Sequence, residues 1–180
     1  MILKSFELDK INLKRNKIIL FYGKNEGHKN EAISALTKKI ENILIYEENE
    51  ILESSFEFLE SLFTKSLFEN EKFIVIKRAS EKILKILNEI KDKPLNDITI
   101  LINSEALEKK SKLRNFFEKS KLYTCVAFYP DNHQNMLKFA NNYLKIKKFT
   151  ISQENLNLII NKCNEDREKL IHELNKLYFF

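Results

Sequence analysis

The stretch FYGKNEGHKNEA, residues 21–32, has residue types and spacing close to those of a phosphate-binding loop. The nucleotide-binding pattern G-x-x-x-x-G-K-[ST] lies between a strand and a helix. Here Gly23 and Lys29 have the required separation, and the apolar run IIL precedes them. In such a loop the backbone amides and the lysine hold phosphates, and the final hydroxyl binds Mg²⁺.

Two positions of the loop depart from this pattern. His28 replaces the second glycine, where a left-handed backbone would cost roughly 1–2 kcal/mol and a ring would enter the phosphate cradle. Asn30 replaces the hydroxyl residue, and an amide oxygen is a poor ligand for strictly octahedral Mg²⁺. We therefore interpret Gly23, His28, Lys29 and Asn30 as a degenerate, inactive phosphate loop. Binding of an anion at the helix N-terminus is a lesser alternative.

Nucleotide hydrolysis also needs an acidic residue at the end of a buried strand, where it positions the metal and the attacking water. The apolar run FIVIK instead continues into Lys77 and Arg78, and ITILIN ends at Asn103 and Ser104. We therefore expect no catalytic residue, no cofactor and no metal. A divergent ATP-hydrolysing P-loop protein, with Lys29 contacting phosphate, is the alternative hypothesis.

Short apolar runs alternate with amphipathic stretches along the first part of the chain. Strands are expected at 17–22, 43–46, 73–77, 98–103 and 123–128. Helices are expected at 30–40, around Phe56 to Phe63 with Ser54 or Ser55 as cap, at 81–90 and at 112–119. Strands that are buried on both faces have continuous apolar runs, so the pattern predicts an α/β fold with a parallel sheet flanked by helices.

The pattern changes at Tyr129-Pro130-Asp131, where proline favours an extended residue before it and Asp131 can cap a following helix. Three apolar stripes at helical spacing follow: Met136, Leu137, Ala140 and Leu144; Leu156, Ile159, Ile160 and Cys163; Leu170, Leu174 and Leu177. The sequence therefore predicts an α/β domain over 1–128 and a small three-helix domain over 129–180.

The composition, with 43% hydrophobic and 32% charged residues, is that of a globular protein. Cys125 and Cys163 lie far apart without metal-ligand spacing, so we expect free thiols in a reducing compartment. With no leader pattern and no apolar run of about 18 residues, we expect a cytoplasmic protein without a membrane partner.

The net charge of +5 suits a polyanionic partner, although lysine is abundant along the whole chain. Lys109, Lys110, Lys112 and Arg114 lie in a basic cluster that could touch DNA phosphates, and solvated helix faces are the alternative. A DNA-binding helper protein that acts through its lysines is thus a third hypothesis. We interpret His133 and His172 as surface or interface histidines without a catalytic role.

Several stretches resemble, in order, the delta subunit of bacterial DNA polymerase III, which is the clamp-opening member of the sliding-clamp loader. They are ILFYGKNEG at 19–27, SLFENEKFIVIKRA at 66–79, EKKSKLRNFFEK at 108–119, VAFYPDNHQNMLKFANNYL at 126–144 and HELNKL at 172–177. The resemblance implies a RecA/AAA+-like domain with a degenerate nucleotide site, followed by a small helical domain.

The resemblance also implies a site at Leu67 and Phe68. In the family, a Leu-Phe pair at this point enters a hydrophobic pocket of the ring-shaped clamp and helps to open it. Two adjacent large apolar residues followed by charged Glu69, Glu71 and Lys72 would form an anchor with a polar rim. Burial of each side chain on a partner contributes roughly 1.5–3 kcal/mol. The alternative from the residues alone is that both side chains pack on their own sheet.

As implied by the resemblance, the expected function is to bind and open the sliding clamp (beta subunit) for loading onto primed DNA during replication, without hydrolysing ATP. The family belongs to the DNA polymerase III holoenzyme, a nucleotidyltransferase, and its other expected partners are the remaining clamp-loader subunits and, indirectly or weakly, DNA. Family members carry a third, helical collar domain, and this chain ends at Tyr178-Phe179-Phe180 instead. We therefore expect either a truncated chain or an unusually short member.

Overall fold

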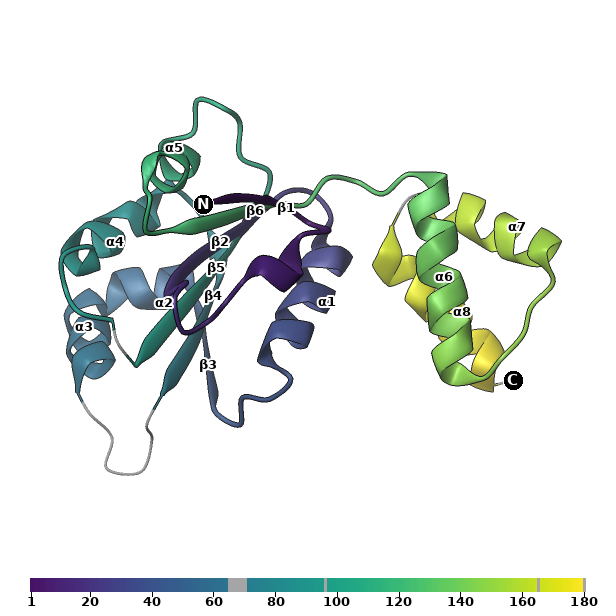
Figure 1. Ribbon diagram of the computed structural model, residues 1–180, viewed down its shortest axis with the longest axis horizontal. Helices are drawn as coiled ribbons and strands as arrows, with labels where there is room; N and C mark the ends of the chain where they lie inside the picture. Colours follow the sequence, from purple (N-terminus) through teal and green to yellow (C-terminus); the bar gives the residue numbers. More distant parts are fainter. Residues whose placement is uncertain (65–70, 96, 165, 180) are drawn as a thin grey trace.

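A six-stranded, all-parallel sheet forms the centre of the first part of the chain (Figure 1). The computed structural model describes residues 1–64, 71–95, 97–164 and 166–179. The strands are β1 (Ile2–Lys4), β2 (Ile18–Tyr22), β3 (Ile43–Glu47), β4 (Lys72–Ala79), β5 (Ile98–Ser104) and β6 (Thr124–Ala127). Their order across the sheet is β1-β6-β2-β5-β4-β3. The parallel α/β fold that the apolar runs predict is confirmed.

The central strands are buried along their whole length because helices cover both faces of the sheet. Every residue of β2 and of β5 is buried, which explains why these runs lack a polar alternation. The sheet contains one strand more than the five expected from the sequence. The additional strand β1 has only three residues and pairs with β6 at the edge of the sheet, so it is too short to produce a recognisable apolar run.

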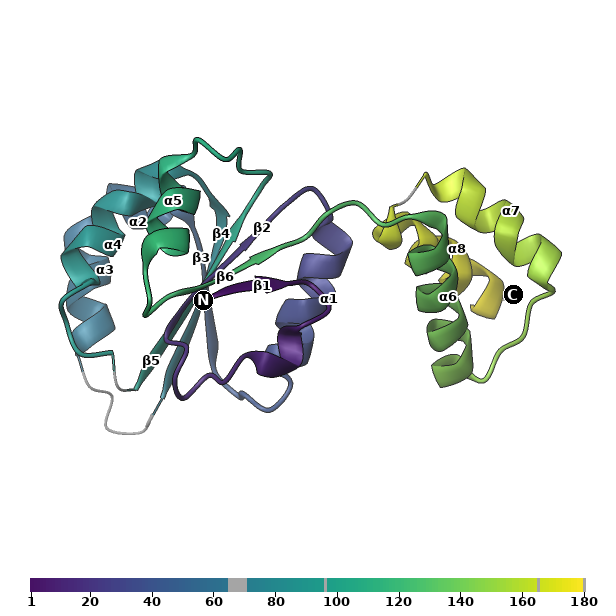
Figure 2. The same cartoon turned by 45° about the horizontal axis from the view of Figure 1, so that its top comes forward.

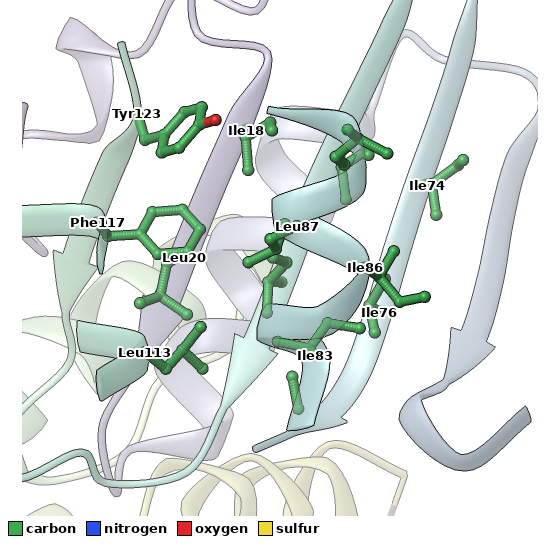
Figure 3. Packing of buried hydrophobic residues seen from close by; sticks show 14 of the residues in the cluster. Ile18, Leu20, Ile74, Ile76, Ile83, Ile86, Leu87, Leu113, Phe117 and Tyr123 are labelled. Atoms are coloured by element: carbon green, nitrogen blue, oxygen red, sulfur yellow. The ribbon is translucent and has the colours of Figure 1, made fainter. Parts of the chain in front are cut away.

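The helices divide unequally between the two faces of the sheet (Figure 2). They are α1 (Glu26–Thr37), α2 (Glu48–Glu53), α3 (Ser55–Phe63), α4 (Leu84–Ile90) and α5 (Lys112–Lys119), with short 3-10 turns η1 (Leu8–Lys10) and η2 (Glu81–Ile83). Helix α1 covers one face, and α2 to α5 cover the other. Figure 3 shows the larger core, in which Leu113, Phe117 and Leu87 pack against strand residues Ile18 and Leu20.

Several helix boundaries differ from the sequence expectations. Helix α1 begins at Glu26 rather than Asn30, because Asn25 caps it by accepting a hydrogen bond from the His28 amide. Helix α2 was not expected, and its capping box is formed by Glu47 and Glu50 rather than by a serine. Ser54 does precede α3, but its side chain makes no capping hydrogen bond within the described residues.

The last part of the chain forms the expected three helices: α6 (His133–Lys147), α7 (Gln153–Cys163) and α8 (Arg167–Phe179). Their buried residues form one separate core that includes Met136, Leu156 and Leu170. Leu177, which was expected in this core, is 42% exposed near the end of α8. The residue that caps α6 is Asn132, not Asp131, because the Asp131 carboxylate is engaged elsewhere.

Candidate functional site

The loop after β2 is shorter than the phosphate-loop pattern requires, because α1 already begins at Glu26, and it is fastened to the end of β6. Gly23 has a φ of +134°, and a Cβ at this position would lie 2.0 Å from the Phe128 carbonyl oxygen. The Gly23 amide donates a hydrogen bond to the Glu105 carbonyl (3.1 Å). Both the backbone conformation and the close approach therefore require glycine here.

The ammonium group of Lys29 is satisfied by the protein itself. Its side chain is 1% exposed, and its Nζ donates to the Ser104 carbonyl oxygen at 2.7 Å. The same Nζ lies 2.6 Å from Oε2 of Glu26, which is in the first turn of α1. A carboxylate at a helix N-terminus is favourable, as a phosphate would be. The Glu26 side chain therefore supplies the negative charge that a bound nucleotide would bring.

His28 adds no positive charge to the loop. Its ring meets Phe128 edge-on, with 5.0 Å between the ring centroids. Burial, with a smaller contribution from the nearby Arg167 cation, lowers the pKa of His28 to about 4. The imidazole is therefore neutral near pH 7.

Asn30, at the position of the magnesium-binding hydroxyl, donates its side-chain amide to Glu168 Oε1 of α8 at 2.9 Å. This contact ties the first turns of α1 to the helical domain. Together with the Lys29 pair, it gives the loop structural bonds where a phosphate loop has ligand bonds. These contacts are consistent with a degenerate loop. That the loop does not bind phosphate stays a prediction.

A cavity of about 670 Å³ nevertheless lies at the carboxyl ends of β4 and β5, beside this loop. Lys24, Lys77 and Arg78 line it, together with Asn103 at the end of β5. Arg78 has a left-handed backbone (φ 52°), and its Nε lies 2.9 Å from Glu47 Oε2. As expected from the sequence, β4 carries two cations, Lys77 and Arg78, just before its last residue Ala79, where a hydrolase would place a carboxylate.

Asn103 connects this cavity to the loop. Its Nδ2 donates to Glu26 Oε1 at 2.8 Å, so the Glu26 carboxylate bridges Asn103 and Lys29. Its Oδ1 is buried and has no hydrogen-bond partner among the described residues. Glu47 Oε2, at the end of β3, is likewise buried without a hydrogen-bond partner among those residues, although it lies 2.9 Å from Arg78 Nε. The Asn103 oxygen can therefore accept a hydrogen bond from a ligand or a water molecule in the cavity.

A buried ionic cluster, which sequence reasoning missed, joins the sheet domain to α8. Arg167 binds the Asp131 carboxylate with two nitrogens (2.5 and 3.0 Å) and Glu31 Oε2 with the third (2.6 Å). Asn25 Nδ2 donates to Asp131 Oδ2 at 2.7 Å. Gly27 permits this approach, since a Cβ there would lie 2.9 Å from the Arg167 Cβ. The Pro130-Asp131 boundary was the only local signal.

The four residues predicted to touch DNA do not have equally free side chains. Lys109 and Lys112 are exposed, whereas Lys110 pairs with Glu108 at 3.0 Å. The Arg114 guanidinium donates to Glu118 and to the Leu107 carbonyl, and it lies over the Tyr22 ring. Arg114 therefore has a structural role in fastening α5, and DNA contact by the three lysines stays a prediction.

Leu67 and Phe68 lie outside the described residues. The structure does show how the chain on either side is held. Helix α3 ends at Phe63, and Lys72 at the start of β4 donates its Nζ to the carbonyl oxygens of Ser61 (2.5 Å) and Thr64 (2.6 Å). A cation at the C-terminus of a helix is favourable. Lys72 thus fixes the distance between the two ends of the segment that carries Leu67 and Phe68.

The residues that the structure covers lack two further kinds of feature. No cluster of three or more histidine, cysteine, aspartate or glutamate side chains could hold a metal ion there. None of the described helices is long and apolar enough to cross a membrane.

No family model matches the chain, and no curated protein matches it. Solved structures do resemble it. The DNA clamp loader delta protein of Bacillus subtilis aligns with a TM-score of 0.61 at 16% identity, over 98% of this chain and 57% of that one. AMPPCP-bound DnaA from Aquifex aeolicus gives 0.57 at 16% identity, over 96% of this chain and 58% of that one. Domain III of the replication initiation protein DnaA from Thermotoga maritima gives 0.55 at 13% identity, over 96% and 79%.

These likenesses establish an AAA+-like fold: a parallel sheet with helices on both faces, followed by a helical domain. At such low identities they establish the fold alone. The chain spans little more than half the length of the clamp loader delta protein that it resembles.

Proposed function

We propose that the chain is a delta subunit of a bacterial DNA polymerase III clamp loader, which binds and opens the sliding clamp for loading onto primed DNA without hydrolysing ATP. The observation that carries this proposal is the internal pairing of Lys29 with Glu26 and the Ser104 carbonyl. Because of this pairing, the ammonium group of Lys29 has protein partners where a phosphate-binding lysine would contact a nucleotide. The fold that the chain shares with a clamp loader delta protein supports the same reading.

The proposed contact with the clamp is made by Leu67 and Phe68, in the connection between α3 and β4. The described residues support this proposal because Lys72, which follows the connection, donates hydrogen bonds to the carbonyl oxygens of Ser61 and Thr64, which precede it. Holding both ends lowers the entropy that an apolar anchor would lose on binding. The proposed partners also include other clamp-loader subunits and DNA, and the proposed domain division is 1–128 and 129–180.

Surface-immobilised sliding clamp tests this proposal directly. The unmodified chain should bind saturably, and Leu67→Ala with Phe68→Ala should weaken binding by at least about tenfold, because anchor residues dominate interface energies. Phe56→Ala with Leu122→Ala is a matched control, since both side chains are exposed and lie outside the segment. Equal affinity of the anchor double variant and the unmodified protein, with both folded by circular dichroism, would refute the anchor.

A second candidate function is nucleotide hydrolysis by a divergent AAA+ protein. The observation that favours it is the cavity of about 670 Å³ with the unpaired Asn103 Oδ1 at its wall. A fluorescent ATP analogue, titrated with and without Mg²⁺, separates the two candidates. Saturable magnesium-dependent binding that is lost in Lys29→Ala would support hydrolysis, and its absence in the folded protein would support the first proposal.

A further inference from the structure

A groove lies between the outer edge of β3 and the helices α2 and α3, with a volume of about 620 Å³. Its floor consists of the half-buried Tyr46 and of Ile51 and Phe58, which belong to the buried core, and the rings of Tyr46 and Phe58 meet edge-on with 5.4 Å between centroids. Glu50 and Glu57 line it as well. The groove shares no lining residue with the cavity beside the phosphate loop.

The strand that borders the groove is an open edge of the sheet. In the part of the chain that the structure describes, β3 pairs with β4 on one side and with no strand on the other. Ile45 is 57% exposed, and Phe56 at the start of α3 is 73% exposed. Proteins commonly block such edges with lysine, proline or a bulge, but β3 has the sequence ILIYE and a regular register. The edge is therefore able to accept another strand.

The negative charge around the groove favours a partner strand that is positively charged. Residues 47–60 contain six glutamates and no lysine or arginine, although the whole chain has a net charge of +5. Glu47 pairs with Arg78, and Glu48 accepts hydrogen bonds from Ser80 and Ile83. The other four are exposed and have no cation within ion-pair distance in the described structure; they are Glu50, Glu53, Glu57 and Glu60.

We propose that this groove binds an extended peptide segment of a partner protein, rich in lysine or arginine at alternate positions. The segment would add to β3 as a new strand, with backbone hydrogen bonds to the open edge. On the face of α2 and α3, its lysine or arginine side chains would lay their stems along Tyr46 and bring their cations to Glu50 and Glu57. On the opposite face, its apolar side chains would lie beside the exposed Ile45. A second copy of this chain, paired through β3, fits less well because the glutamates of the two copies would face each other.

The proposed site is independent of clamp binding and has its own test. The probes are fluorescein-labelled peptides of about nine residues, enough to span the five residues of β3 with a flank at each end. In one set of peptides, valine or isoleucine alternates with lysine or arginine. In a second set, glutamate replaces each lysine or arginine, and in a third set the basic peptides carry N-methyl groups on alternate backbone amides. We expect saturable anisotropy changes with basic members only, about tenfold weaker binding after N-methylation, and slower hydrogen exchange at those alternate amides of β3 that face the open edge rather than β4.

Two variants of α3 provide the matched pair. Glu57→Lys reverses a charge in the groove, and Glu60→Lys makes the same change three residues along the same helix, outside it. We expect about fivefold weaker peptide binding for Glu57→Lys and unchanged binding for Glu60→Lys. The proposal would be overturned if both variants lost affinity equally, or if acidic peptides bound as well as basic ones. It would also be overturned if no basic peptide bound saturably, or if sedimentation showed a β3-mediated dimer that excludes the peptides.

Discussion

The two ends of the parallel sheet satisfy their polar groups in opposite ways. At the carboxyl end, Lys29 has Glu26 and Ser104 as partners, and Arg167 has Asp131 and Glu31, so the side chains that could hold a ligand hold one another. At the amino end of β4, the Lys72 ammonium donates to the carbonyl oxygens of Ser61 and Thr64, and these contacts join the two sides of the segment that carries Leu67 and Phe68. The comparison teaches that residues which match a phosphate loop in sequence can hold the protein together through their own ion pairs and hydrogen bonds.

The largest expected effect comes from the ionic cluster at the carboxyl end. Arg167→Ala leaves the buried Asp131 carboxylate without its cation, and such a loss costs about 3–5 kcal/mol of unfolding free energy. Denaturant unfolding measures it. Lys169→Ala on the same helix is the control, since its side chain is 67% exposed, and it should change stability by less than about 0.5 kcal/mol. If the two variants were equally stable, the cluster would not hold the domains together.

A smaller effect is expected at the phosphate-loop lysine. Lys29→Met removes the cation but keeps most of the side-chain volume. It takes the ammonium donor from the Ser104 carbonyl and leaves Glu26 with the Asn103 amide alone. We expect a loss of about 1–3 kcal/mol in unfolding free energy. Lys24→Met, five residues earlier in the loop before α1 and exposed, should be nearly neutral. An unchanged stability in Lys29→Met, combined with lost nucleotide affinity, would make Lys29 a ligand-binding residue instead.

The effect that is smallest at neutral pH, and that grows as the pH falls, is a pH dependence at His28. Its pKa is lowered to about 4 in the folded protein from an ordinary value of 6.5, so the unfolded chain binds more protons between these values. The neutral His28 therefore favours folding above about pH 6.5, and this contribution is lost as the pH falls toward 4. His28→Gln should flatten the dependence of unfolding free energy on pH over that range. The exposed His133→Gln should leave the dependence as it is. Identical profiles for the His28 variant and the unmodified protein would contradict the burial of the imidazole.

The sheet could be predicted from the sequence because its central strands are continuous apolar runs, each one local in the chain. Strand β1 could not, since three residues at an edge carry too little pattern. The start of α1 was missed because residues 26–29 contain no apolar side chain, and the helix begins there through the Asn25 cap. Periodicity finds the part of a helix that faces a core, not its polar first turn.

The candidate site was predictable in its residues but not in its partners. The loop pattern identified Gly23, His28, Lys29 and Asn30, and the spacing of Glu26 and Lys29, three apart on a helix, was a signal that could have revealed their ion pair. Arg167 and Asp131 offered no such signal. They are 36 residues apart and meet only because α8 packs against the first turns of α1.

The central claim is that the chain acts by binding a partner rather than by using a nucleotide, and one titration experiment tests it most directly. The sliding clamp and a Mg²⁺-bound ATP analogue are each titrated into the unmodified protein, Leu67→Ala with Phe68→Ala, and Lys29→Met. We predict that the clamp binds the unmodified protein and Lys29→Met alike but not the double variant, and that the analogue binds none of the three. Nucleotide binding that Lys29→Met abolishes, with clamp binding indifferent to the double variant, would contradict the account.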